Sequence, residues 1–197
     1  MIDPRMLGFI CARYKFTAKM LEGLDDVLEI GCGDAFGAPI VGQAVRDLTC
    51  TDIDGEQLAN NTERCRASNI NFVEWDFRFR PYPRNVDAIY MLDVIEHLFP
   101  WEEETFLRNV FGSMNEDGVL IIGTPNRYAD RFASEHSRHG HLNLKEPHEL
   151  REIGEENFRN SFMFGMNDET LHTGFAPMSH YLLLLASCPK KEEWVPR

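Results

Sequence analysis

The sequence has no apolar run long enough to cross a bilayer. Its longest apolar stretch, Tyr181 to Ala186, is far shorter than the roughly 20 residues of a spanning helix. Its five cysteines form no C-x-x-C pair, and no secretory leader is recognisable at the N-terminus. These absences predict a cytoplasmic protein with reduced thiols and no membrane partner.

Positive charge is also scarce. Lys and Arg number 20 against 32 Asp and Glu, which gives a net charge of −12, and no local basic cluster offsets it. Binding to a phosphate backbone requires concentrated positive charge. The composition therefore predicts that nucleic acid is not a partner.

No internal repeat or low-complexity linker divides the chain. Its 197 residues, 43% of them hydrophobic, suit a single domain over residues 1–197. Residues 1–23 are predicted to form an N-terminal helix, because apolar residues recur at helical spacing from Met6 to Leu21. The polar residues 189–197 are predicted to be a loose tail.

Strand-like apolar segments alternate with helical ones along most of the chain. Seven strands are predicted, at 26–30, 48–53, 71–75, 86–92, 118–124, 161–166 and 180–187, with helices at 38–46, 55–68, 102–114 and 147–157. This alternation indicates βαβ units, hence an α/β fold with a mostly parallel sheet. Residues 126–146 show no clear period and are predicted to form a substrate loop.

A glycine turn follows the first predicted strand. Gly31, Gly33 and Gly37 have the spacing G-x-G-x-x-x-G, which differs from the dinucleotide fingerprint G-x-G-x-x-G. The first two glycines permit a positive φ and the close approach of a ligand to the backbone. Glu29, just before them, would repel a pyrophosphate and suits a cationic amino-acid ligand. A tight turn that binds no ligand is the alternative.

Asp52 lies at the end of the second predicted strand, 19 residues after Gly33. A carboxylate at this place can accept hydrogen bonds from both hydroxyls of a ribose. The alternative is a helix N-cap, a role that suits Asp54 better. With the glycine turn, Asp52 predicts a nucleotide-like ligand at the carboxyl ends of the strands.

From residue 26 to residue 124, the motifs resemble, in order, those of the class I S-adenosylmethionine-dependent methyltransferases. The resemblance is closest to the small-molecule branch that includes the ubiquinone-biosynthesis-type enzymes. Residues 27–33 resemble the first motif, 74–77 the segment that contacts adenine, 87–97 the fourth motif and 118–124 the fifth strand. The resemblance implies a Rossmann-like seven-stranded sheet, helices on both faces, and a last strand antiparallel beside the fifth.

The resemblance also implies S-adenosylmethionine as the cofactor and S-adenosylhomocysteine as the product. Glu29 and the glycine backbones would hold the methionine portion, Asp52 the ribose, and Asp76 the adenine amino group. Asp34 departs from the small residue that many relatives carry and could lie beside the methionine ammonium. For Asp76, a turn residue is the alternative. The implied cofactor residues are Glu29, Gly31, Cys32, Gly33, Asp34, Asp52, Ile53, Asp76, Phe77, Leu92 and Asp93.

Methyl transfer to oxygen or to a neutral nitrogen often needs a base that works near neutral pH. Histidine suits this role, and the candidates are His97, His139 and His141. For His97, the alternative is a capping or partner-bonded histidine that supports the cofactor loop.

The same loop holds the predicted acceptor contacts and a dense group of histidines. Arg131, Arg138 and Asn143 are predicted to recognise an anionic or hydroxylated acceptor, with a solvated surface loop as the alternative. Residues 135–141 contain three histidines, which could bind zinc or iron. The segment lacks a helical H-x-x-x-H pair and companion cysteines, so the sequence predicts no metal site.

Together these features predict methyl transfer from S-adenosylmethionine to a small polar metabolite at oxygen or nitrogen. A sugar, a nucleotide sugar or a secondary-metabolite precursor would suit. A non-catalytic methyltransferase-like subunit is one alternative. An NAD(P)-dependent oxidoreductase is another, which the glycine spacing and Glu29 disfavour. The sequence leaves the oligomeric state open, with a homodimer among the options.

Overall fold

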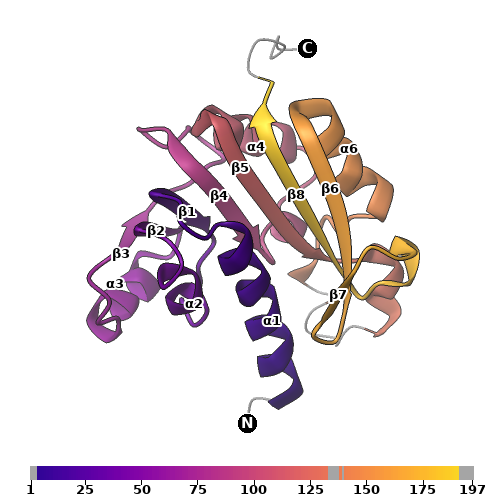
Figure 1. Cartoon of the computed structure of the whole chain (residues 1–197), viewed down its shortest axis with the longest axis horizontal. Helices are drawn as coiled ribbons and strands as arrows, with labels where there is room; N and C mark the ends of the chain where they lie inside the picture. The colour runs from indigo at the N-terminus through magenta and orange to yellow at the C-terminus, as the bar shows by residue number, and fades with distance from the viewer. Residues whose placement is uncertain (1–3, 133–137, 139, 191–197) are drawn as a thin grey trace.

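The computed structural model describes residues 4–132, 138 and 140–190, and over these residues the chain forms one mixed sheet (Figure 1). The strand order is β3-β2-β1-β4-β5-β8-β6-β7. The strands are β1 Asp26–Ile30, β2 Asp47–Asp52, β3 Ile70–Glu74, β4 Val86–Leu92, β5 Met114–Pro125, β6 Phe158–Asn167, β7 Thr170–His172 and β8 Tyr181–Pro189.

The described helices are α1 Pro4–Met20, α2 Ala38–Gly42, α3 Gly55–Arg64, α4 Glu103–Gly112 and α6 Pro147–Asn157. Short 3-10 helices, η1 Ile95–His97, η2 Arg127–Phe132 and η3 Ala176–Met178, connect the strands near the site. None of the described helices combines the length and the apolar character needed to cross a membrane.

The five strands from β3 to β5 are parallel, and β8 lies antiparallel between β5 and β6. The predicted α/β class and the antiparallel last strand beside the fifth are thereby confirmed. The strand count is corrected, because the described residues form eight strands where seven were predicted. The additional strand, β7, pairs with β6 through Asn167 and Thr170 and is too short to show a period of two in the sequence.

Two hydrophobic clusters fill the spaces on the opposite faces of the sheet. Helices α1, α2 and α3 contribute to one cluster, and α4 and α6 contribute to the other (Figure 1). Successive residues of β1 alternate between them, since Val27 belongs to the first cluster and Leu28 to the second. A strand buried on both faces reads as a nearly continuous apolar run, which explains why these strands were visible in the sequence.

Some predicted boundaries shift in the structure. Helix α1 ends at Met20, and β5 already begins at Met114, inside the segment predicted as helical. Pro189 is buried and the Lys190 N–H donates to the Asn157 carbonyl over 2.8 Å, so a loose tail cannot begin at residue 189. Residues 191–197 lie outside the described part of the chain.

Helix α1 packs directly on the glycine turn that follows β1. A Cβ atom at Gly37 would lie 2.2 Å from the aromatic ring of Tyr14, which is closer than any real Cβ contact. Glycine at position 37 therefore lets α1 approach the segment that the sequence marks for a ligand.

We expect Gly37→Ala to lower the free energy of unfolding by about 1–3 kcal/mol, because the added methyl group must displace Tyr14. Urea unfolding measures this change. Gly112→Ala is the matched control, because its nearest atom would be Pro81 Cβ at 3.7 Å, an ordinary contact. An equal loss in both variants would show that the contact between α1 and the turn is unimportant.

Candidate functional site

The glycine turn connects β1 to α2 at the edge of the sheet where the parallel strands end. Gly31 and Gly33 have φ values of 71° and 51°, in the region that favours glycine. A Cβ at Gly31 would lie 2.5 Å from a methyl of Val94, whereas one at Gly33 would have no atom within 4 Å. Gly31 is thus required by packing against the chain after β4, while the space beside Gly33 is open.

Asp52 ties the ends of β1 and β2 together. Its Oδ2 accepts the Gly33 N–H over 2.8 Å, and its Oδ1 accepts the N–H groups of Ile53 and Asp54 over 2.7 and 3.1 Å. Asp54 accepts the Gln57 N–H over 3.0 Å and caps α3, as predicted for it. Asp52 is therefore free of the capping role and remains partly exposed for the hydroxyls of a ligand.

A pocket of about 430 Å³ opens beyond Asp52, at the ends of β2 and β3. Two predicted cofactor residues, Ile53 and Asp76, line this pocket together with Trp75. The Arg80 guanidinium lies over the Trp75 ring, 4.0 Å from its centre. The lining residues of the pocket are Ile53, Glu74, Trp75, Asp76, Phe79 and Arg80. Flat aromatic and guanidinium groups of this kind suit a planar heterocycle.

Asp76 is already paired with a neighbour in this pocket. Arg78 donates to both carboxylate oxygens, over 2.7 Å from Nη2 to Oδ2 and 3.0 Å from Nε to Oδ1. Burial alone would raise the pKa of Asp76, but the hydrogen bonds from Arg78 hold that pKa below its ordinary value. Phe77 is 1% exposed and packs in the core beside Phe106, so it can meet a ligand only through its backbone.

Glu29 points to the face of the sheet that α1 covers. The carboxylate is 1% exposed and accepts hydrogen bonds from the Tyr14 hydroxyl over 2.8 Å and from the Cys50 thiol over 3.2 Å. Burial raises the pKa of Glu29 above its ordinary value. The predicted methionine contact therefore lies beneath Tyr14. Of the other turn residues, Cys32 is buried and Asp34 is exposed, where it accepts the Phe36 N–H over 3.1 Å.

The end of β4 is held by a second residue of α1. Asp93 has a φ of 57° and forms an ion pair with Arg13 over 2.7 Å, while the Arg13 guanidinium lies 3.7 Å from the centre of the Tyr181 ring. Leu92, just before it, is 7% exposed and belongs to the core. Sequence reasoning missed Arg13, because only the packing of α1 on the sheet brings it to the site.

The chain beyond β4 meets the loop predicted to contact the acceptor. Glu96 is 0% exposed and accepts the Thr124 hydroxyl over 3.0 Å, and burial, with the nearby charge of Asp93, raises the pKa of Glu96 to about 8. Its carbonyl accepts the N–H groups of Leu142 and Asn143 over 2.7 and 2.9 Å. These backbone bonds fix the loop above the end of β4.

Two of the three candidate histidines come together here. The ring centres of His97 and His141 are 5.5 Å apart, and His97 Nδ1 lies 2.8 Å from the carbonyl oxygen of Gly140. Burial and the neighbouring His97 lower the pKa of His141 below its ordinary value. The third candidate, His139, lies outside the described residues.

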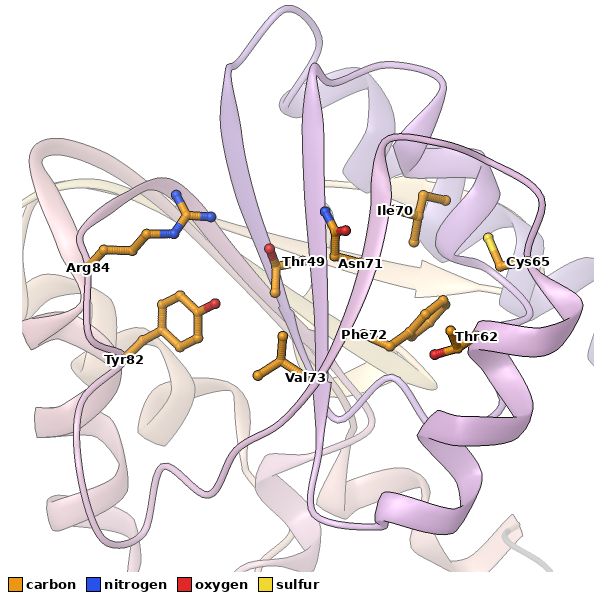
Figure 2. A pocket seen from close by; sticks show the side chains of 9 residues that line it. All are labelled: Thr49, Thr62, Cys65, Ile70, Asn71, Phe72, Val73, Tyr82 and Arg84. Carbon is orange, nitrogen blue, oxygen red and sulfur yellow. The ribbon is translucent and has the colours of Figure 1, made fainter.

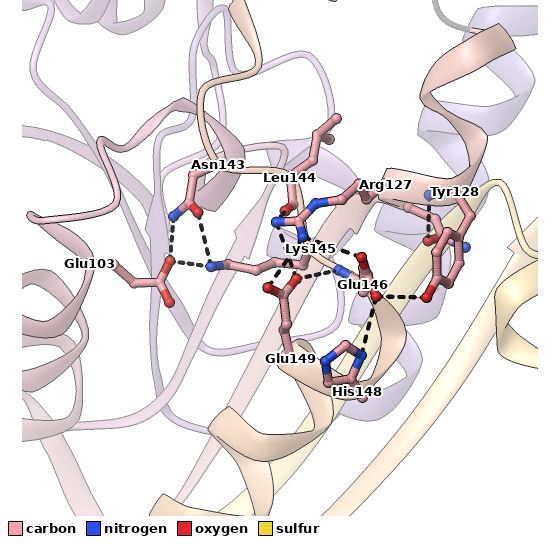
Figure 3. A network of polar contacts seen from close by, with 10 residues as sticks. Glu103, Arg127, Tyr128, Asn143, Leu144, Lys145, Glu146, His148 and Glu149 are labelled. Carbon is pink, nitrogen blue, oxygen red and sulfur yellow. Dashed lines mark hydrogen bonds and ion pairs between the residues drawn. The ribbon is translucent and has the colours of Figure 1, made fainter.

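The three predicted acceptor contacts occupy different environments. Arg131 and Arg138 are exposed, and the Arg131 guanidinium lies 4.7 Å from the centre of the Phe132 ring. Asn143 is 8% exposed, and Figure 3 shows its amide turned toward Glu103 and Lys145. Asn143 therefore anchors the loop, and the two arginines remain available to an acceptor.

A second network fastens the end of the same loop. Arg127 lies 3.4 Å from Glu146 and 3.2 Å from Glu149. Figure 3 shows its guanidinium between these two carboxylates. The partners of Arg127 stand at the start of α6, where the Glu146 N–H donates to Glu149 in a capping box. The loop is thus held at both of its described ends.

A larger pocket, of about 510 Å³, lies at the edge strand β3 and contains none of the predicted site residues. Figure 2 shows Tyr82 and Arg84 on one side of β3, with Thr62 and Cys65 on the other. The predicted cofactor residues lie instead around the smaller pocket and at the ends of β1, β2 and β4.

The known proteins to which this chain is similar are methyltransferases. A methyltransferase-domain family model matches residues 28–122. A probable S-adenosylmethionine-dependent methyltransferase of Mycobacterium tuberculosis is 32% identical over 103 residues, which is 52% of this chain and 36% of that protein. A fatty-acid O-methyltransferase of Mycolicibacterium smegmatis is 29% identical over 98 residues, or 48% of this chain and 35% of that protein. The chain thus spans only about a third of these relatives.

The fold also has solved counterparts. The N-methyltransferase NodS from Bradyrhizobium japonicum, solved with S-adenosylhomocysteine, superposes with a TM-score of 0.67 at 18% identity. The superposition covers 90% of this chain and 87% of that one. At this identity the likeness concerns the fold.

The pH dependence of stability tests whether Glu29 is a buried carboxyl group beneath α1. Because burial raises its pKa, the folded state holds a proton there more tightly than the unfolded chain does. The stability that depends on Glu29 therefore falls as the pH rises from about 4.3 towards the raised value. We expect the Tm of Glu29→Gln to gain on that of the parent protein as the pH is raised from about 5.

Differential scanning calorimetry across this pH range measures the difference. Glu104→Gln is the control, because the Glu104 side chain is 75% exposed and pairs with Arg108 on a helix surface. If the Tm difference between Glu29→Gln and the parent protein were the same at every pH, the raised pKa of Glu29 would be contradicted.

Proposed function

We propose that this chain is a class I S-adenosylmethionine-dependent methyltransferase that transfers the methyl group of that cofactor to a small polar metabolite. The observation that carries the proposal is the joining of the glycine turn to Asp52 beside a pocket with flat side chains. A nucleoside with an attached cationic amino acid fits this arrangement in shape and charge.

The residues present suit such a cofactor part by part. The partly exposed Asp52 carboxylate can accept ribose hydroxyls, and Ile53 and Trp75 line the pocket that would take the adenine. The open space beside Gly33 would admit the methionine portion, next to the Asp93 carboxylate at the end of β4. In this arrangement Glu29 lies beneath Tyr14, whose hydroxyl donates to it, and does not contact the methionine portion directly.

When bound, S-adenosylmethionine supplies a methyl group on a positively charged sulfur, which keeps the carbon–sulfur electron pair as the acceptor's lone pair forms the new bond. The protein must place the acceptor in line and remove any proton. His97 suits the removal of a proton. Because the Gly140 carbonyl can only accept, Nδ1 carries the hydrogen and Nε2 keeps a lone pair.

The acceptor side is formed by the histidines and by the exposed arginines of the loop. Arg131 and Arg138 suit an anionic or hydroxylated metabolite. The relatives include an O-methyltransferase and an N-methyltransferase, so either atom could accept the methyl group. The net charge of −12 and the free cysteines support a cytoplasmic enzyme that does not act on nucleic acid.

Calorimetric titration with S-adenosylmethionine, with NADH as the control ligand, tests the cofactor. We expect one saturable site for S-adenosylmethionine and at least about a 10-fold loss of affinity in Asp52→Ala, because the variant loses the ribose acceptor and frees the Gly33 N–H. Asp54→Ala is the matched control, since it removes a carboxylate two residues away that only caps α3.

Binding of NADH instead, or equal affinity in both variants, would contradict the proposal. Release of S-adenosylhomocysteine in the presence of candidate metabolites then measures turnover. Tight cofactor binding with no turnover on any hydroxylated or anionic metabolite would favour the non-catalytic subunit.

A further inference from the structure

Glu96, His97 and His141 form a compact cluster at the end of β4. One potential ligand atom from each side chain lies within 4.8 Å of the other two. Glu96 and His97 belong to η1, and His141 comes from the loop that returns above it. A cluster drawn from two distant segments is invisible in the sequence as a motif, which is why the spacing of residues 135–141 alone indicated no metal.

Two polar atoms of this cluster are buried without partners. Glu96 Oε1 and His141 Nδ1 have no hydrogen-bond partner among the described residues, and both are inaccessible to solvent. A buried polar atom left unpaired costs about 1–3 kcal/mol. The cluster thus contains two buried polar atoms without a hydrogen-bond partner, and a bound cation would give such atoms a partner.

The remaining contacts prepare the three side chains to bind a cation. Hydrogen bonding of Nδ1 to the Gly140 carbonyl leaves His97 Nε2 with a free lone pair, the arrangement in which a backbone carbonyl orients a metal-binding histidine. Thr124 holds the other oxygen of Glu96. The two N–H bonds from Leu142 and Asn143 to the Glu96 carbonyl fix the segment that carries His141.

We propose that Glu96, His97 and His141 bind one divalent transition-metal cation, of the class to which Zn²⁺ belongs. Two imidazoles and a carboxylate are the donors that such cations prefer, whereas Mg²⁺ prefers oxygen alone. A cation about 2.1 Å from each donor holds the donors about 3–4 Å apart, so the side chains need only small rotations.

The position of the cluster suggests that its cation contacts the acceptor, and this part of the inference rests on the proposed function. Val94, two residues before Glu96, contacts Gly31 of the glycine turn, so the cation would lie next to the methionine end of the cofactor site. Three protein ligands leave coordination positions for oxygen atoms of an acceptor. The site therefore favours acceptors that present a hydroxyl, whose pKa the cation would lower so that its proton leaves to water. With His97 Nε2 bound to the cation, the removal of the proton assigned above to His97 would pass to the cation.

Titration of the chelator-treated protein with Zn²⁺ by calorimetry tests the site directly. We expect one Zn²⁺ per chain, and affinities at least about 100-fold weaker in Glu96→Gln and in His141→Ala. Co²⁺ serves as a second probe, because its visible absorption bands report histidine and carboxylate ligation. Mg²⁺ should bind far more weakly than Zn²⁺.

His148→Ala is the matched control, since this exposed histidine stands beside Glu146 on α6 and should leave Zn²⁺ binding unchanged. Glu96→Gln preserves the size of the side chain, and its thermal unfolding in chelator shows whether the fold is intact. Failure of the parent to bind Zn²⁺, tighter binding of Mg²⁺, or equal Zn²⁺ affinity in all variants would overturn the site.

Titration of the same chelator-treated protein with S-adenosylmethionine separates the two proposals. If S-adenosylmethionine binds but Zn²⁺ does not, only the metal site is overturned. If Zn²⁺ binds with the expected variant pattern but S-adenosylmethionine does not, the metal site stands and the proposed function is overturned.

Discussion

The rest of the site depends on the hydrogen bonds that the Asp52 carboxylate accepts from backbone N–H groups. One of these bonds reaches Gly33 and joins the end of β2 to the turn after β1. Gly31 and Gly33 of this turn have positive φ, a conformation that a free chain would leave readily. This crosslink holds the turn in place beside the flat-walled pocket and leaves the space next to Gly33 open.

Helix α1 completes the site by covering the polar ends of β1 and β4. Tyr14 closes over the buried Glu29, and Arg13 neutralises Asp93. Charged groups at the edge of a hydrophobic sheet are costly unless each has a partner. The helix therefore has two roles, since it buries apolar side chains in the core and gives the acidic groups at the strand ends a partner.

Two carboxyl groups whose pKa is raised by burial lie at one edge of the sheet. Glu29 and Glu96 are both enclosed near the carboxyl ends of β1 and β4, and burial raises both pKa values. Elsewhere the described acidic residues lie mainly on the surface, where they give the chain its negative charge. The proposed cofactor site and the proposed cation site both lie at this edge, and perturbed pKa values are typical of functional sites.

The sequence by itself determined the alternating strands, the parallel sheet and the glycine turn, because these depend on local periodicity and on the backbone freedom of glycine. It also identified Asp52 and the capping role of Asp54, since both follow from their place beside a strand end. Only the tertiary structure decided that Arg13 meets Asp93, 80 residues away, that Asn143 turns inward, and that His141 joins Glu96 and His97. Those contacts depend on the path of α1 and on the path of the loop before α6. Both paths are fixed by packing on the folded sheet, and no local sequence pattern encodes them.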